Sequence, residues 1–312
     1  MKKYIFDTDI GADCDDAVAL LYILGKMKDG ECEVKAITLC TARKCASTAT
    51  LALIRDFGYG DIPIGEYKGE PLGCDSIDNY AETIAGGDNC VEEDAVKLMR
   101  KTLVENDRVD IICLGPSCNI ANLIDSPADE YSEKNGVALI KEKVGKLYIM
   151  GGAFEFNEQE NPFPEWNIEQ DIPSARKTFE KFPCETVIIP SEVGARVSTT
   201  ANSIRGLTRK AIEVFFRTVD ERNGIKYEEN LERTRPSWDP LTCMAAINEE
   251  KYNYSERGIV YISENGVTKF KKEKTGKCRY MTLNNDLKKT EKQLNEYLKS
   301  LMRGGSKNGE GD

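Results

Sequence analysis

The most informative segment lies near the amino terminus, where five aspartates fall within ten positions: Asp7, Asp9, Asp13, Asp15 and Asp16. There, a short apolar run is followed by an apolar pattern of helical period. Open α/β sheets bind ligands at the carboxyl ends of their strands, so these carboxylates lie where chemistry is expected. Clustered carboxylates suit a hard cation or acid–base catalysis. The chain contains no histidine, which excludes histidine triads, histidine-ligated zinc and imidazole acids.

The composition is that of an enzyme-sized globular protein of 312 residues, for which we predict one domain over 1–302 and a disordered tail over 303–312. A net charge of −10 argues against nucleic acid polymers and membranes as partners, because anionic surfaces require basic patches. No apolar run approaches the roughly 18 residues of a spanning helix, and the start becomes acidic too early for a signal peptide. The eleven cysteines form no C-x-x-C pair, which predicts reduced thiols and a cytoplasmic protein.

Strand-like and helix-like runs alternate along the first two thirds of the chain. This alternation predicts an α/β fold with a Rossmann-like, mostly parallel, doubly wound sheet. Beyond residue 195 the pattern predicts extra C-terminal helices and a late pair of strands. The predicted strands are 4–6, 34–39, 62–64, 109–114, 146–150, 186–189, 259–262 and 279–283. The predicted helices are 16–27, 46–57, 94–104, 119–124, 173–182, 203–219, 239–247 and 286–302.

Four further segments place turn-forming and polar residues where elements meet. In 111–121 a strand ends at a glycine–proline turn, and in 150–154 paired glycines permit close approach of backbone to a ligand. An acid, an aromatic and an amide stand together in 164–168, and an acid opens an apolar helix in 237–241. Each has an ordinary structural explanation, such as a helix cap at Asp239 before Pro240. Taken together, the set indicates a functional site.

The order and spacing of these motifs resemble the nucleoside hydrolase family, in particular its inosine-uridine preferring members, which cleave the N-glycosidic bond of ribonucleosides. The resemblance runs from Lys3 to about residue 250. It implies a Rossmann-like sheet with calcium bound at the carboxyl edge, where the ion holds the attacking water and the ribose hydroxyls. It also implies a small-molecule nucleoside substrate, a place in purine and pyrimidine salvage, and a homodimer or homotetramer.

The same resemblance assigns roles to single residues. It makes Asp9 both a calcium ligand and the catalytic base, and Asp16 and Asp239 further carboxylate ligands. Leu114 would lend its backbone carbonyl to the ion, while Asp15 would bind the ribose hydroxyls. Calcium prefers six to eight oxygen ligands, and a single acting base predicts direct displacement with inversion. The other substrate-binding positions implied by the resemblance are Met150, Asn161, Glu165 and Asn167.

The sequence departs from the family pattern in three places. The acidic motif reads D-x-D-x-G-x-D-x-D-D instead of D-x-D-x-G-x-D-D, which leaves Asp13 as an extra acid without an assigned role. After the second strand the usual Gly-Asn is absent, so its ribose contact is lost or replaced by Thr41. Trp238 stands where many members have a histidine that protonates the leaving base. Trp238 and Trp166 either stack on a nucleobase or only pack beside the site.

Three hypotheses of different classes follow. The first is a calcium-dependent N-ribosyl hydrolase. The second is a catalytically weak ribose- or nucleoside-binding protein on the same fold, suggested by Trp238 and the missing asparagine. The third is a phosphatase of the haloacid dehalogenase type, suggested by Asp7-Thr8-Asp9, although Gly11 stands where that motif requires threonine or valine. Ribose release from nucleosides, compared with phosphate release from phosphomonoesters, separates the three.

Overall fold

The computed structural model describes residues 1–11, 13–76, 81–85, 93–156, 162–205, 207 and 233–303. The strands of its large sheet are β1 (Lys2–Thr8), β2 (Cys32–Leu39), β3 (Ile64–Glu66), β4 (Glu93–Asp94), β5 (Val109–Cys113), β6 (Val144–Met150), β7 (Glu185–Ile189), β10 (Gly258–Ile262), β11 (Thr268–Lys272) and β12 (Cys278–Tyr280). A separate antiparallel hairpin consists of β8 (Ser198–Thr200) and β9 (Thr234–Pro236).

In sequence, most of the helices connect one strand to the next. They are α1 (Asp15–Lys28), α2 (Ala46–Asp56), α3 (Ala81–Ile84), α4 (Ala95–Glu105), α5 (Cys118–Asp125), α6 (Gly136–Lys143), α7 (Trp166–Gln170), α8 (Ile172–Lys181), α9 (Ser191–Gly194), α10 (Ala201–Ile204), α12 (Trp238–Ile247) and α13 (Leu287–Arg303). None of these helices is both long and apolar enough to cross a membrane, as far as the described residues extend.

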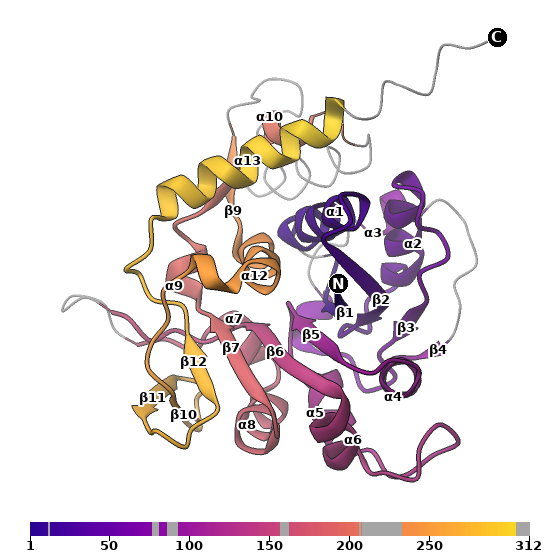
Figure 1. Ribbon diagram of the computed structural model, residues 1–312, viewed down its shortest axis with the longest axis vertical. Helices are drawn as coiled ribbons and strands as arrows, with labels where there is room; N and C mark the ends of the chain where they lie inside the picture. Colours follow the sequence, from indigo (N-terminus) through magenta and orange to yellow (C-terminus); the bar gives the residue numbers. More distant parts are fainter. Residues whose placement is uncertain are drawn as a thin grey trace.

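The strand order β11-β10-β12-β7-β6-β5-β1-β2-β3-β4 explains where a ligand site must lie (Figure 1). The chain runs from β1 outward to β4, then returns to β5 on the other side of β1 and continues outward again. The strands from β12 to β4 in this order are all parallel. In such sheets, ligands bind beyond the carboxyl ends at the point where the order reverses. That point lies between β1 and β5.

The central parallel strands are buried on both faces, as parallel strands with helical crossovers must be. Side chains alternate along β1, so Tyr4 and Phe6 belong to one core, whereas Ile5 belongs to the other. The first core is closed by α1, α2 and α12, and the second by α4, α5, α6 and α8. Figure 1 shows these helix groups on opposite sides of the strands. Burial on both faces explains why the strands read as continuous apolar runs.

The C-terminal helix α13 fastens the β8–β9 hairpin to the rest of the structure. Leu294 and Leu298 on α13 are fully buried against the first core. The Asn295 amide donates to the Ser198 carbonyl at 2.7 Å and accepts from the Thr200 N–H at 2.9 Å. Because β9 carries side chains of the pocket described below, α13 contributes to their placement from the far end of the sequence.

The predicted fold class is confirmed, with differences at the edges of the pattern. Strand β3 begins at Ile64 and not at residue 62, because Pro63 has no N–H to donate to the sheet. The sequence analysis did not predict β11, α6 or the β8–β9 hairpin, which are short elements with weak periodicity. Of the helix predicted over 203–219, residues 206 and 208–219 lie outside the described part, as do residues 304–312 of the predicted tail.

Candidate active site

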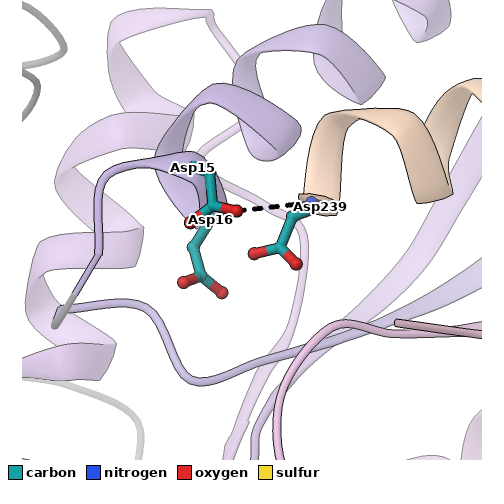
Figure 2. Close-up of side chains that lie close together, drawn as sticks. All are labelled: Asp15, Asp16 and Asp239. Carbon is teal, nitrogen blue, oxygen red and sulfur yellow. Dashed lines mark hydrogen bonds between the residues drawn. The ribbon is translucent and has the colours of Figure 1, made fainter. Parts of the chain in front are cut away.

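Two helix amino termini bring the late aspartate to the early ones. Asp15 and Asp16 open α1, Asp239 lies in the first turn of α12, and negative charge is favourable at such positions. The Asp239 N–H donates to Asp15 Oδ2 at 3.4 Å, across 224 positions of sequence (Figure 2). Carboxylate oxygens of the three residues all lie within 4.8 Å of one another. All three side chains are buried, at 3–5% exposure.

The electrostatics of this aspartate cluster (Asp15, Asp16 and Asp239) are unfavourable without a cation. Burial raises the pKa of each carboxyl well above its ordinary range, and repulsion by neighbouring carboxylates adds to the increase. The Thr8 hydroxyl donates to Asp16 and opposes the shift of the Asp16 pKa only in part. A bound cation would offset both the cost of burying these charges and the repulsion between them. The donors are all oxygen atoms, so the residues present fit a hard divalent cation.

Asp9 follows β1 and lies beside the cluster. Asp9 is not part of the group of three whose carboxylate oxygens all lie within 4.8 Å of one another, yet its charge contributes to the raised pKa of Asp16. Burial raises the pKa of Asp9 to about 6, while the positive charge of Arg43 opposes the increase. A Cβ at Gly115 would collide with the Asp9 carboxylate and with Cys40 Sγ. The glycine of the turn after β5 therefore leaves room for the Asp9 carboxylate.

The backbone after β5 and β6 is held by Asn167. Its amide nitrogen donates to the Leu114 carbonyl at 2.7 Å and to the Met150 carbonyl at 3.3 Å. A carbonyl oxygen has two lone pairs, so Leu114 can still coordinate an ion. Glu165 caps α7 by accepting the Asn167 N–H at 3.1 Å, and it also accepts the Gly152 N–H at 3.1 Å. Glu165 therefore orients the wall of the site, and burial raises its pKa to about 7.

One pocket of about 390 Å³ unites the predicted positions. Apart from Thr41, every described residue that the sequence analysis assigned to catalysis, substrate or metal lines this pocket. Asn161 lies outside the described residues. Thr41, named as a replacement for the missing asparagine, is not among the described residues that line the pocket, and its hydroxyl donates to Asp75. Trp166 also lines the pocket and is 46% exposed.

Comparison with known proteins identifies the family. A family model for the inosine-uridine preferring nucleoside hydrolases matches residues 4–296. The chain belongs to this family. It is therefore a hydrolase of N-glycosyl compounds, and the phosphatase hypothesis is wrong. The family match and the aspartate cluster both indicate a metal site at this edge of the sheet.

Relatives of this nucleoside hydrolase align with it along most of their length. Two curated relatives from Arabidopsis thaliana are both 26% identical to the chain. The first, probable uridine nucleosidase 2, aligns over 86% of this chain and 84% of its own length, and uridine nucleosidase 1 over 85% and 80%. Among solved structures, the plant nucleoside hydrolase PpNRh1 has a TM-score of 0.70 at 21% identity, covering 96% of this chain and 99% of its own. The purine-preferring ribonucleoside hydrolase from Gardnerella vaginalis has a TM-score of 0.71 at 19% identity, covering 97% and 100%.

Two arginines of this nucleoside hydrolase were not predicted from the sequence. Arg43 is buried, and its positive charge acts on Asp9. It packs against Gly11, whose φ of +130° and missing Cβ leave the space that the guanidinium stem occupies. Arg235 lies on β9, lines the pocket and forms an ion pair with Asp13. No local sequence pattern predicts either arginine, because each one interacts with an aspartate on another segment of the chain.

Proposed function

We propose that this chain hydrolyses the N-glycosidic bond of a ribonucleoside, or of a closely related N-riboside, with calcium in the aspartate cluster and with Asp9 as general base. The observation that carries the proposal is the burial of Asp15, Asp16 and Asp239 together at the point where the strand order reverses. Three buried carboxylates at this spacing are ionised together only when a positive partner balances them. Family membership supplies the reaction class, and the oxygen-only donor set favours calcium over softer metals.

The residues divide between ion and substrate. We assign Asp9, Asp16, Asp239 and the Leu114 carbonyl to the calcium. Asp15 accepts the Asp239 N–H through one carboxylate oxygen, which leaves its other oxygen to accept a ribose hydroxyl. When bound, calcium would supply the positive charge that orients the water and the ribose cis-diol.

The chain's own groups carry the proton and the charge. Asp9 accepts a proton from the water that attacks C1′ of the ribose, and the nucleobase leaves from the opposite face, so the configuration inverts. The ribose becomes oxocarbenium-like as the bond breaks, and the surrounding carboxylates stabilise that positive charge. Met150 and Asn167 form the wall against which the ribose lies, and Glu165 holds that wall in place through backbone hydrogen bonds.

The proposal extends to the cellular setting of the enzyme. We assign it to purine and pyrimidine salvage in the cytoplasm, as a homodimer or homotetramer. Sedimentation equilibrium of the purified chain tests the oligomeric state, and a monomer at micromolar concentration would contradict it.

The decisive experiment measures release of reducing sugar from a panel of purine and pyrimidine nucleosides, with calcium and with a chelator. We expect ribose from at least one nucleoside with calcium, little with the chelator, and loss of turnover in Asp9→Asn. Asp61→Asn is the matched control, because Asp61 is exposed and its substitution changes the net charge equally. Tight nucleoside binding without any ribose release would instead favour the hypothesis of a catalytically weak ribose- or nucleoside-binding protein.

A further inference from the structure

The extra acid of the N-terminal motif has a specific partner in the pocket. The Arg235 side chain donates through Nε to Asp13 Oδ1 at 3.0 Å and through Nη2 to Asp13 Oδ2, across 222 positions of sequence. Asp13 Oδ1 also accepts the Cys14 N–H at 2.6 Å. The carboxylate is thus held by the backbone where α1 begins. Bidentate pairing of this kind fixes the plane of the guanidinium.

The fixed guanidinium lies over a fixed aromatic ring. Arg235 Cζ is 5.5 Å from the centre of the Trp238 ring, within the range of a cation–π contact. The Trp238 indole donates through Nε1 to the Ser191 carbonyl at 3.0 Å. The indole also packs so closely on Gly194 that a Cβ at this position would collide with it. Asp13, Arg235 and Trp238, here named the base corner, line the same pocket as the aspartate cluster.

The base corner presents hydrogen-bond donors and positive charge. A guanidinium has five N–H donors, and Asp13 uses two of them along one edge, Nε and Nη2. Three N–H groups on Nη1 and Nη2 remain, and the Arg235 side chain is 23% exposed. Of the described residues that line the pocket, Arg235 is the one with a basic side chain. Trp238 immediately precedes Asp239, so the corner adjoins the place assigned to the calcium, which would orient the ribose hydroxyls.

We propose that Arg235 stabilises the departing nucleobase as an anion, and that Asp13 is the residue that positions Arg235. The inference rests on the proposed function and adds to it the group that assists the leaving base. A chain without histidine has no imidazole to protonate that base. An arginine does not give up its proton at ordinary pH, but its N–H groups can hold negative charge as that charge forms.

The step balances without a protein acid. The bond between C1′ and the base nitrogen breaks, and its electron pair stays on the base. The water oxygen bonds to C1′, and the water proton goes to the Asp9 carboxylate. The base departs as an anion, accepts hydrogen bonds from Arg235 Nη1 and Nη2, and takes its proton from solvent after release. Bases that present carbonyl oxygens or ring nitrogens toward Arg235 meet this arrangement best.

The test compares leaving groups with and without need of assistance. Inosine and uridine require stabilisation of the base, whereas p-nitrophenyl riboside releases a delocalised phenolate that leaves unaided. Arg235→Met should lower kcat/KM for the two nucleosides roughly 10²–10³-fold, the usual loss of one charge-stabilising donor. For p-nitrophenyl riboside the loss should be less than about tenfold on the same principle. Arg235→Lys keeps the positive charge but not the planar guanidinium, so its loss on the nucleosides should be smaller than that of Arg235→Met but still measurable.

Arg257→Met provides the matched control. Arg257 is an exposed arginine, paired with Glu185 far from the pocket, so its loss should leave both substrates unaffected. Melting temperature and calcium binding of every variant show whether the fold and the ion site persist. Equal losses on the nucleosides and on p-nitrophenyl riboside would overturn the inference, because they would show a general defect in ribose binding. If the wild type releases no ribose from any substrate, it is the proposed function that fails.

A double-mutant cycle tests the positioning role of Asp13. Asp13→Asn alone should lower nucleoside hydrolysis and spare p-nitrophenyl riboside, as Arg235→Met does. In the Arg235→Met background, Asp13→Asn should have little further effect, because residues that act through one another are not additive. Full additivity of the two losses would refute a role for Asp13 through Arg235.

Discussion

Replacing Asp239 by asparagine should stabilise the metal-free protein and reduce its stabilisation by calcium. Asparagine keeps the shape of the side chain and removes one of three buried charges. Carboxylate oxygens in the cluster lie within 4.8 Å of one another. Two unit charges at that separation repel by about 3.5 kcal/mol at an effective dielectric constant of about 20. Because the pKa of Asp239 is raised, a bound proton relieves part of this repulsion in the metal-free protein.

The sign of the pH dependence follows from the same carboxyl group. Its pKa in the folded state lies well above the ordinary value of 3.8, so the folded protein binds more protons than the unfolded chain above that pH. The metal-free wild type should therefore lose stability as the pH rises above 3.8. Asp239→Asn should lose less, since the substituted side chain does not ionise.

Urea unfolding with calcium and with a chelator measures both effects. At a calcium concentration about 100 times the dissociation constant, the wild type should gain about 2.7 kcal/mol, and Asp239→Asn should gain far less. Asp61→Asn, an exposed substitution with the same change in net charge, should behave as the wild type. If calcium stabilises Asp239→Asn as much as the wild type, or if the metal-free variant is the less stable one, the aspartate cluster is not the cation site.

Three further predictions concern the base, the fold and acid stability. Asp9→Asn should lower turnover roughly 10²–10⁴-fold in the ribose-release assay while calcium binding by calorimetry persists, and full activity would show that another group is the base. Arg100→Met should cost about 3 kcal/mol in urea unfolding, because Arg100 is 2% exposed and pairs through two nitrogens with Asp129; an unchanged midpoint would contradict this. Burial opposes ionisation of Glu249, but the hydrogen bond from Lys146 and neighbouring basic charge lower its pKa below 4.5. The contribution of Glu249 to stability is therefore present above pH 4.5 and lost as the pH falls through the lowered pKa. Glu249→Gln should therefore lose less stability than the wild type when the pH falls through this range.

Much of the fold and part of the site could be predicted from the sequence, because both depend on local patterns. Apolar runs identified the parallel strands except the two-residue β4, and helical periodicity identified α1, α2, α4, α5, α8, α12 and α13. The early aspartates were placed correctly at a strand end and a helix start, as their spacing predicts. The oxygen-rich, histidine-free composition also restricted the chemistry to carboxylates and a hard cation.

Only the tertiary structure determined which distant residues meet. Asp239 reaches Asp15 because α12 packs on α1, and Arg235 reaches Asp13 because α13 holds the β8–β9 hairpin beside the pocket. The structure also made Glu165 a helix cap, and it grouped Asp15 more closely than Asp9 with the other cluster members. Periodicity reports which face of an element is buried, whereas partners more than 200 residues away depend on strand order and helix packing. Local spacing could therefore predict that the acids cluster, but not which side chains balance their charge.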